Sequence, residues 1–149
     1  VISMSILRRV GTSQDERDAY LRSPRWRDNQ GAAGLSDERF AEIADKEQFI
    51  LTVTENGYGK RSSAYEYRRT NRGGSGIINI VTSERNGGVV ASFPVKQGEQ
   101  LMLVTDQGKM IRTTVGDIRI AGRNTQGVTI FNVADGERVV SVARIDESE

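Results

Sequence analysis

Residues 49–63 read FILTVTENGYGKRSS, and residues 100–114 read QLMLVTDQGKMIRTT. Each segment opens with an apolar, strand-forming run, passes through a short polar turn that contains glycine, and continues with hydroxyl and basic side chains at alternate positions. Asn56-Gly57 in the first segment is the strongest short signal for a β-hairpin, and Asp106-Gln107-Gly108 stands at the same point of the second. Both segments therefore predict a hairpin, and the chain reads as all-β.

The similarity of the two segments belongs to a longer repeat. Residues 49–80 align without a gap on residues 100–131, at an offset of 51, with seven identities in 32 positions. Three identities are arginines, which are surface residues and owe nothing to a shared core. They pair Arg61 with Arg112, Arg68 with Arg119 and Arg72 with Arg123. A period near 50 made of short strands predicts a propeller or array, whose units cannot each bury a hydrophobic face alone.

Further strands complete each unit. Residues 77–80 and 128–131 predict one more strand in each copy, and residues 89–93 and 139–143 predict another. Each copy thus offers about four strands, the content of one propeller blade. The expected fold class is all-β, with β-propeller-like pinwheel repeats that amount to about two four-stranded blades, and with a short helical insertion.

This interpretation divides the chain into four parts. Residues 1–10 would be the last strand of a preceding blade, residues 11–48 an acidic helical insertion, residues 49–99 one blade, and residues 100–149 a second blade followed by the start of an acidic tail. The chain opens on an apolar run like the one that ends each repeat, and it does not begin with methionine. We therefore expect a fragment of a longer protein.

The insertion is predicted to hold two short helices. Ser13-Gln14-Asp15-Glu16 matches a capping box at the start of the first. Ser36 can cap the second, with Asp37 and Glu38 in its first turn, where the helix dipole favours anions. The insertion carries no recognisable chemistry.

Composition excludes several classes of function. The chain has no cysteine and no histidine, which removes disulfides, thiol chemistry, the usual general base and the nitrogen and sulfur ligands of structural zinc. No stretch approaches the roughly 18 apolar residues of a membrane span. The net charge of +1 conceals an asymmetry, because residues 49–80 and 100–131 are basic while residues 11–48 are acidic. No catalytic residue, metal site or membrane contact is expected in this chain.

Longer motifs carry a family resemblance. Residues 55–61, ENGYGKR, with residues 72–80 behind them, closely resemble the C-terminal domain of the DNA gyrase A subunit, as do residues 103–108 and 118–128 in the second copy. The resemblance covers roughly three-quarters of the chain. It implies a six-bladed β-pinwheel, in which neighbouring blades exchange strands, and it makes this chain the last two blades and one strand of the blade before.

The resemblance also implies a function. Domains of this family bend duplex DNA around a basic outer edge, and the parent is an ATP-dependent type II topoisomerase that introduces negative supercoils. The implied partners are double-stranded DNA, the rest of the gyrase A subunit and the gyrase B subunit in an A2B2 assembly, in the bacterial cytoplasm at the nucleoid. Magnesium, ATP and the nucleophilic tyrosine would belong to other regions of the enzyme. The wrapping box of the first blade is not in this chain, and residues 70–76 match it only in part because Ser75 replaces its lysine.

The recurrent basic residues are the candidate DNA contacts. At equivalent points of successive blades they would lie at intervals around a curved rim, on the sheet face away from the core, which suits phosphate neutralisation along a bent duplex. The candidates are Lys60, Arg61, Arg68, Arg69, Arg72, Lys109, Arg112, Arg119 and Arg123. For any of them the alternative is a solvated arginine or an ion pair between blades. For the chain, the alternatives are the C-terminal segment of the topoisomerase IV A subunit or a propeller that binds proteins.

Overall fold

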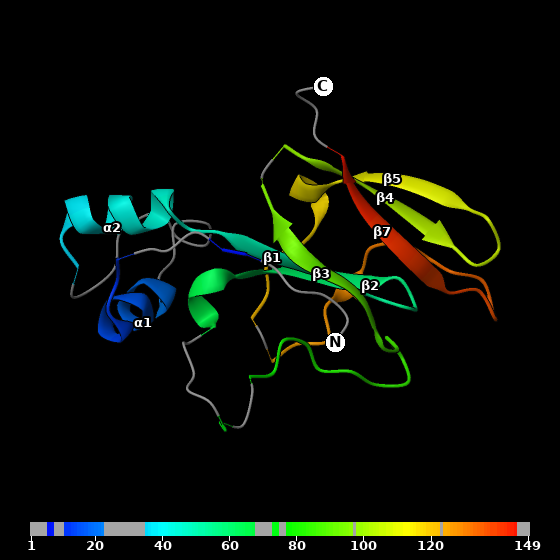
Figure 1. Ribbon diagram of the computed structural model, residues 1–149, viewed down its shortest axis with the longest axis horizontal. Helices are drawn as coiled ribbons and strands as arrows, with labels where there is room; N and C mark the ends of the chain where they lie inside the picture. Colours follow the sequence, from blue (N-terminus) through cyan, green and yellow to red (C-terminus); the bar gives the residue numbers. More distant parts are fainter. Residues whose placement is uncertain are drawn as a thin grey trace.

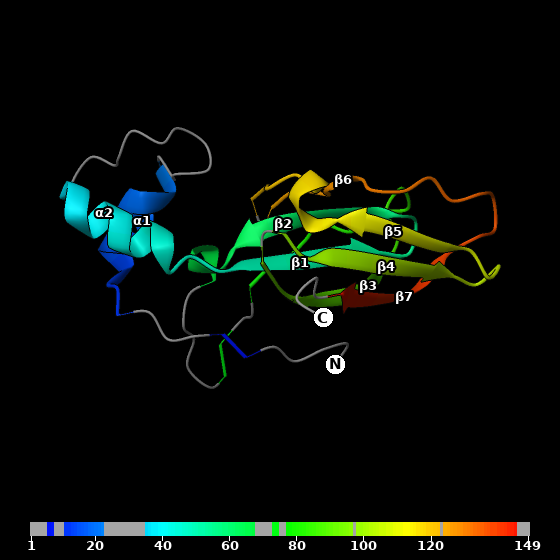
Figure 2. The same cartoon turned by 90° about the horizontal axis from the view of Figure 1, so that it is seen from above.

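The computed structural model describes residues 6–7, 11–22, 35–67, 73–74, 77–96, 98–122 and 124–145. Within these residues two short helices precede two antiparallel sheets. The elements are α1 (Gln14–Arg22), α2 (Asp37–Asp45), β1 (Phe49–Thr54), β2 (Tyr58–Ser63), the 3₁₀ turn η1 (Ala64–Glu66), β3 (Val89–Val95), β4 (Gln100–Thr105), β5 (Met110–Thr114), the 3₁₀ turn η2 (Val115–Asp117), β6 (Val128–Thr129) and β7 (Val139–Ile145). The helices lie together at one end of the molecule, and the sheets form the other end (Figures 1 and 2).

The two sheets reproduce the sequence repeat. The first sheet has the strand order β3-β1-β2-β6, and the second has the order β5-β4-β7. Each sheet contains a predicted hairpin, β1–β2 or β4–β5. The first strand of the hairpin also pairs with the strand that ends the repeat, so β1 pairs with β3 and β4 pairs with β7. A register irregularity falls at Val53/Thr54 in the first sheet and at Val104/Thr105 in the second. The predicted repeat is therefore confirmed, and the two copies share even the position of this irregularity.

The second repeat completes the sheet of the first. Strand β6 belongs by sequence to the second copy, yet it pairs with β2 through Tyr58↔Thr129 and Gly59↔Val128. The chain then bends over the first hairpin, where the backbone N–H of Ile130 donates to the carbonyl of Gly57 at 2.8 Å. Gly127 has a φ of +81°, and a Cβ there would lie 2.8 Å from the carbonyl oxygen of Gly59, so only glycine fits this close approach. This interlocking confirms the strand exchange that the resemblance implies.

Two of the predicted strands differ from the structure. Residues 77–80 form no strand, and β6 covers only two of the four residues predicted at 128–131. The physical reason lies in the exchange, because β6 exists through its pairing with the hairpin of the other repeat. Residues 77–80 have no corresponding hairpin before them among the described residues. The strand predicted within residues 1–10 lies outside the described residues, except for Ile6 and Leu7, which are in no strand.

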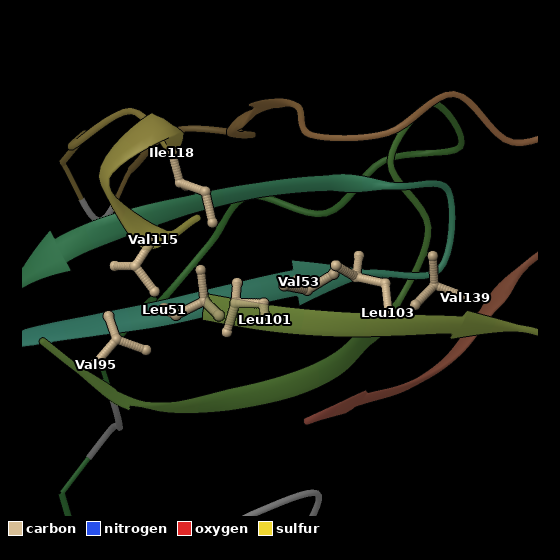
Figure 3. Close-up of a cluster of buried hydrophobic side chains, with 8 residues drawn as sticks. All are labelled: Leu51, Val53, Val95, Leu101, Leu103, Val115, Ile118 and Val139. Atoms are coloured by element: carbon tan, nitrogen blue, oxygen red, sulfur yellow. The ribbon is translucent and has the colours of Figure 1, made fainter. Parts of the chain in front are cut away.

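The main core lies between the two sheets. Alternate residues of β4 point into it, where Leu101 and Leu103 meet Leu51 and Val53 of β1 (Figure 3). The rest of the cluster comes from β3, β7 and the neighbourhood of η2, namely Val95, Val139, Val115 and Ile118. All of these side chains are buried, so a single apolar cluster holds both repeats together.

A second, smaller core attaches the helices. Tyr20 of α1 packs against Phe40 of α2 and against Tyr65 of η1, with ring centroids 5.3 and 5.6 Å away. The predicted capping box is present, because Ser13 Oγ accepts from the N–H of Glu16 and the N–H of Ser13 donates to the Glu16 carboxylate, each at 3.2 Å. The predicted helices are thus confirmed, and they dock on the end of the first sheet.

Candidate nucleic-acid interface

Five of the nine predicted DNA contacts lie in the part of the chain that the structure describes. They are Lys60, Arg61, Lys109, Arg112 and Arg119. The other four lie outside the described residues, namely Arg68, Arg69, Arg72 and Arg123. The structure separates the five into an exposed group from the second repeat and a buried pair from the first.

The exposed group comes from the second repeat, on the hairpin and on the segment that follows it. Lys109 precedes β5, and its ammonium lies 3.7 Å from the buried carboxylate of Glu137 while its side chain stays 60% exposed. Arg112 lies on β5 and bonds to the side chain of Gln100. Arg119 follows η2 and is exposed, although its backbone carbonyl accepts from the N–H of Arg61 at 2.9 Å. These three cations are accessible to a polyanion.

Lys60 is buried, so its placement on an exposed rim is wrong. Its side chain is 0% exposed. The Nζ group donates to the carbonyl of Gly122 at 2.6 Å, to the Thr125 hydroxyl at 3.2 Å and to the Thr125 carbonyl at 3.3 Å. A buried ammonium requires such acceptors because desolvation otherwise penalises the charge heavily. Lys60 therefore fastens the second repeat onto β2.

Arg61 is buried as well, and its exposed placement is also wrong. Its Nε donates to the carbonyl of Ile118 at 2.8 Å, and its guanidinium lies 5.9 Å from the centre of the Phe49 ring. Desolvation by burial lowers the pKa of Arg61 below its ordinary value. Its backbone is also bonded to the second repeat, since the N–H of Ala121 donates to the Arg61 carbonyl at 2.8 Å. Arg61 thus faces carbonyl groups of the second repeat, where no phosphate reaches.

The contrast between Arg61 and Arg112 comes from the strand exchange. The two residues are equivalent in the repeat, but the outer edge of β2 is covered by β6 and by the parallel bridge from Arg61 to Ile120. No described strand pairs with the outer edge of β5. Burial of a rim residue is thus decided by the neighbouring repeat.

Several exposed cations of the described sheet region were not singled out from the sequence, namely Arg85, Lys96, Arg138 and Arg144, and Arg85 differs from the others by its contact with an aromatic ring. Its Nε donates to the hydroxyl of Tyr58 at 2.8 Å, and its guanidinium lies 5.3 Å from the centre of the Tyr58 ring. Arg85 follows the aligned segment 49–80, and at the offset of 51 its counterpart is Gly136. The pattern of repeated arginines therefore could not point to Arg85.

The helical insertion offers a different electrostatic surface. Arg39 of α2 forms ion pairs with Glu16 and Glu42, and Lys46 pairs with Glu42 at 3.1 Å. The hydrogen bond from Arg39 is the main cause that lowers the pKa of Glu16 to about 2. Carboxylates thus neutralise these cations locally, so the basic surface belongs to the sheets.

The described residues offer neither a metal centre nor a membrane-spanning helix. They contain no group of three or more acidic side chains, histidines or cysteines that could hold a metal ion. Neither α1 nor α2, the helices of the described ranges, has the length and apolar character needed to cross a membrane. The basic surface is therefore the chemical feature that remains to be explained.

Known proteins show where this architecture occurs. The family model described as "DNA gyrase C-terminal domain, beta-propeller" matches residues 48–96 and 99–146. The DNA gyrase A subunit of Rickettsia bellii is 48% identical over 99% of this chain, and that of Granulibacter bethesdensis is 45% identical over all of it. Each alignment covers 18% of the relative, so the chain spans about a fifth of the length of these proteins.

Solved structures give the same answer. "Structure of DNA gyrase A C-terminal domain" matches with a TM-score of 0.62 and 27% identity, over 67% of this chain and 34% of that one. "Crystal structure of the C-terminal domain of DNA topoisomerase IV" matches with a TM-score of 0.61, over 68% of this chain and 32% of that one, but its 20% identity supports only the fold. The family match, the whole-chain relatives and the interlocked repeats agree, and the chain belongs to the DNA gyrase C-terminal domain family.

Proposed function

We propose that this chain is a DNA-binding and DNA-wrapping segment of a DNA gyrase A subunit. The observation that carries the proposal is the exposed cationic group Lys109, Arg112 and Arg119, placed on repeats of the gyrase C-terminal family. Such cations can contact phosphates without forming hydrogen bonds to the bases. The affinity then depends on charge and on how easily the DNA bends, and not on specific bases. The chain would therefore bind duplexes of any sequence.

The interlocked sheets support the wrapping part of the proposal. A shared core and an exchanged strand hold the two repeats in one fixed relation. Cations on such a frame keep fixed spacings, so a duplex that contacts several of them must follow the curvature of the protein. The segment would position DNA and would break no bond itself.

The activity of the whole enzyme is a proposal of the same kind. We infer that the parent is an ATP-dependent type II topoisomerase that introduces negative supercoils, in an A2B2 assembly with the gyrase B subunit in the bacterial cytoplasm, at the nucleoid. ATP and magnesium would be held by other regions of that assembly. The whole-chain relatives at 45% and 48% identity are gyrase subunits, which favours gyrase over topoisomerase IV as the parent.

Duplex binding followed against salt tests the proposal. Fluorescence anisotropy with two labelled duplexes of unrelated sequence should give similar dissociation constants, and log K should fall linearly with log salt at about 0.9 per phosphate neutralised. Undetectable binding to both duplexes at low salt would contradict the proposal and would favour a protein-binding scaffold. A strong preference for one sequence would contradict it as well.

A further inference from the structure

Arg85 is held in place by an aromatic side chain. It lies in the loop between residue 80 and β3, and it is exposed. Its guanidinium covers the ring of Tyr58, the first residue of β2, while its Nε donates to the Tyr58 hydroxyl. The same hydrogen bond is the main cause that lowers the pKa of Tyr58. Stacking and hydrogen bonding together orient the guanidinium more tightly than solvent would.

The loop that carries Arg85 is fixed at both ends. The Asn56 side chain, in the first hairpin turn, donates to the carbonyls of Glu84 and Arg85 at 3.2 and 3.0 Å. Asn86 is 0% exposed, and its side chain donates to the carbonyls of Val81 and Gln126 at 2.8 and 3.1 Å. The backbone on each side of Arg85 is therefore tied to the first hairpin and to the second repeat.

The charge of Arg85 is not neutralised locally. Among the described residues no carboxylate forms an ion pair with its guanidinium, and its single hydrogen bond uses Nε. The two Nη groups are thus left to donate outward. A planar guanidinium with two outward donors suits a phosphate group.

The repeat supplies an independent reason to regard this arginine as functional. Tyr58 corresponds to Lys109 at the offset of 51, so the first hairpin has an aromatic residue where the second has an exposed cation. Arg85, stacked on Tyr58, restores a positive charge at the equivalent point of the first hairpin. Likewise Asn86 corresponds to Glu137, the carboxylate beside Lys109, and both side chains accept the N–H of the residue three positions earlier. The first repeat therefore has a neutral amide at the position where the second has the carboxylate that pairs with its cation.

We propose that Arg85, oriented by the ring and hydroxyl of Tyr58, is a phosphate-binding residue of the first repeat. It would do there what Lys109 is proposed to do in the second, so that the equivalent point of each hairpin presents a cation to the DNA backbone. This inference rests on the proposed function. It concerns one residue, however, so Arg85 could prove not to bind phosphate while the chain still binds duplex DNA.

The test uses the 149-residue chain and a labelled duplex of mixed sequence. Arg85→Gln should weaken binding several-fold at low salt and reduce the slope of log K against log salt by about 0.9, the value for one phosphate contact. Arg22→Gln is the matched control, because Arg22 is an exposed arginine at the end of α1 and loses the same charge. It should leave the slope unchanged. Urea unfolding of each variant confirms that the fold is retained.

Tyr58→Phe separates orientation from charge. It keeps the ring under the guanidinium but removes the hydroxyl, so binding should weaken less than in Arg85→Gln while the slope stays that of the wild type. An unchanged dissociation constant and slope in Arg85→Gln, with steep salt dependence in the wild type, would overturn the inference and leave the proposed function intact. An equal loss of slope in Arg22→Gln would also overturn it, since net charge would then explain the effect. A wild-type chain that binds no duplex would contradict both.

Discussion

Replacing Leu103 with alanine should lower the free energy of unfolding by about 3–5 kcal/mol, the range for emptying a fully buried leucine site. Leu103 is 0% exposed on β4 and belongs to the cluster that includes Leu51 and Val53 of β1. Because this cluster joins the two sheets, a cavity on β4 should destabilise both repeats together. The loss would therefore extend beyond the repeat that carries the substitution.

The position of the tyrosines makes this effect measurable. All four precede residue 68, whereas Leu103 lies in the second repeat. In a Trp26→Phe background, the urea transition followed by tyrosine fluorescence should shift together with the transition in far-UV circular dichroism. Met102→Ala is the control on the same strand, since Met102 is only half-buried, and its shift should be smaller. A tyrosine transition that stays in place while the circular dichroism transition moves would show that the repeats unfold independently.

Replacing Lys60 with glutamate should cost about 3–5 kcal/mol, the magnitude of leaving an uncompensated charge in the interior. The carboxylate would face the oxygens of Gly122 and Thr125, which accept hydrogen bonds from Lys60 in the native protein. Lys60→Met removes the charge but keeps the length of the side chain. It should cost about 1–3 kcal/mol, because the acceptors lose their donor. Urea unfolding measures both changes.

Lys60 also provides a sharp test of the difference between structural and DNA-binding cations. Lys60→Met should leave the slope of log K against log salt unchanged under conditions where the variant is folded, because the buried ammonium reaches no phosphate. A folded Lys60→Met variant with a reduced slope would contradict this assignment. It would return Lys60 to the DNA-binding surface.

The sequence predicts the local parts of this fold well. The apolar run that opens the segment 49–63 forms β1, and the Asn56-Gly57 turn closes the first hairpin as predicted. The Ser13 capping box and the Ser36 cap are also confirmed. Each of these features depends on a few neighbouring residues. Propensity, turn chemistry and capping are therefore enough to specify them.

The predictions that were wrong concern contacts between segments that are distant in the sequence. Residues 77–80 and 128–131 look alike in sequence, yet only Val128 and Thr129 form a strand, because only they pair in register with a strand of the other repeat. Strand periodicity places Lys60 and Arg61 on opposite faces of β2, but it does not say that the second repeat covers both side chains. The contact of Arg85 with Tyr58 could not be predicted, because the two residues are 27 positions apart in the sequence. Long-range packing decided each of these outcomes.

The central claim is that exposed cations of the interlocked repeats contact the phosphates of duplex DNA. The variant that replaces Lys109, Arg112 and Arg119 with glutamine tests it most directly, because all three are exposed and lie on the second repeat. Salt titration of duplex binding should show a slope reduced by about 2.7, since each lost phosphate contact contributes about 0.9. A folded triple variant that keeps the wild-type slope and dissociation constant would contradict the account.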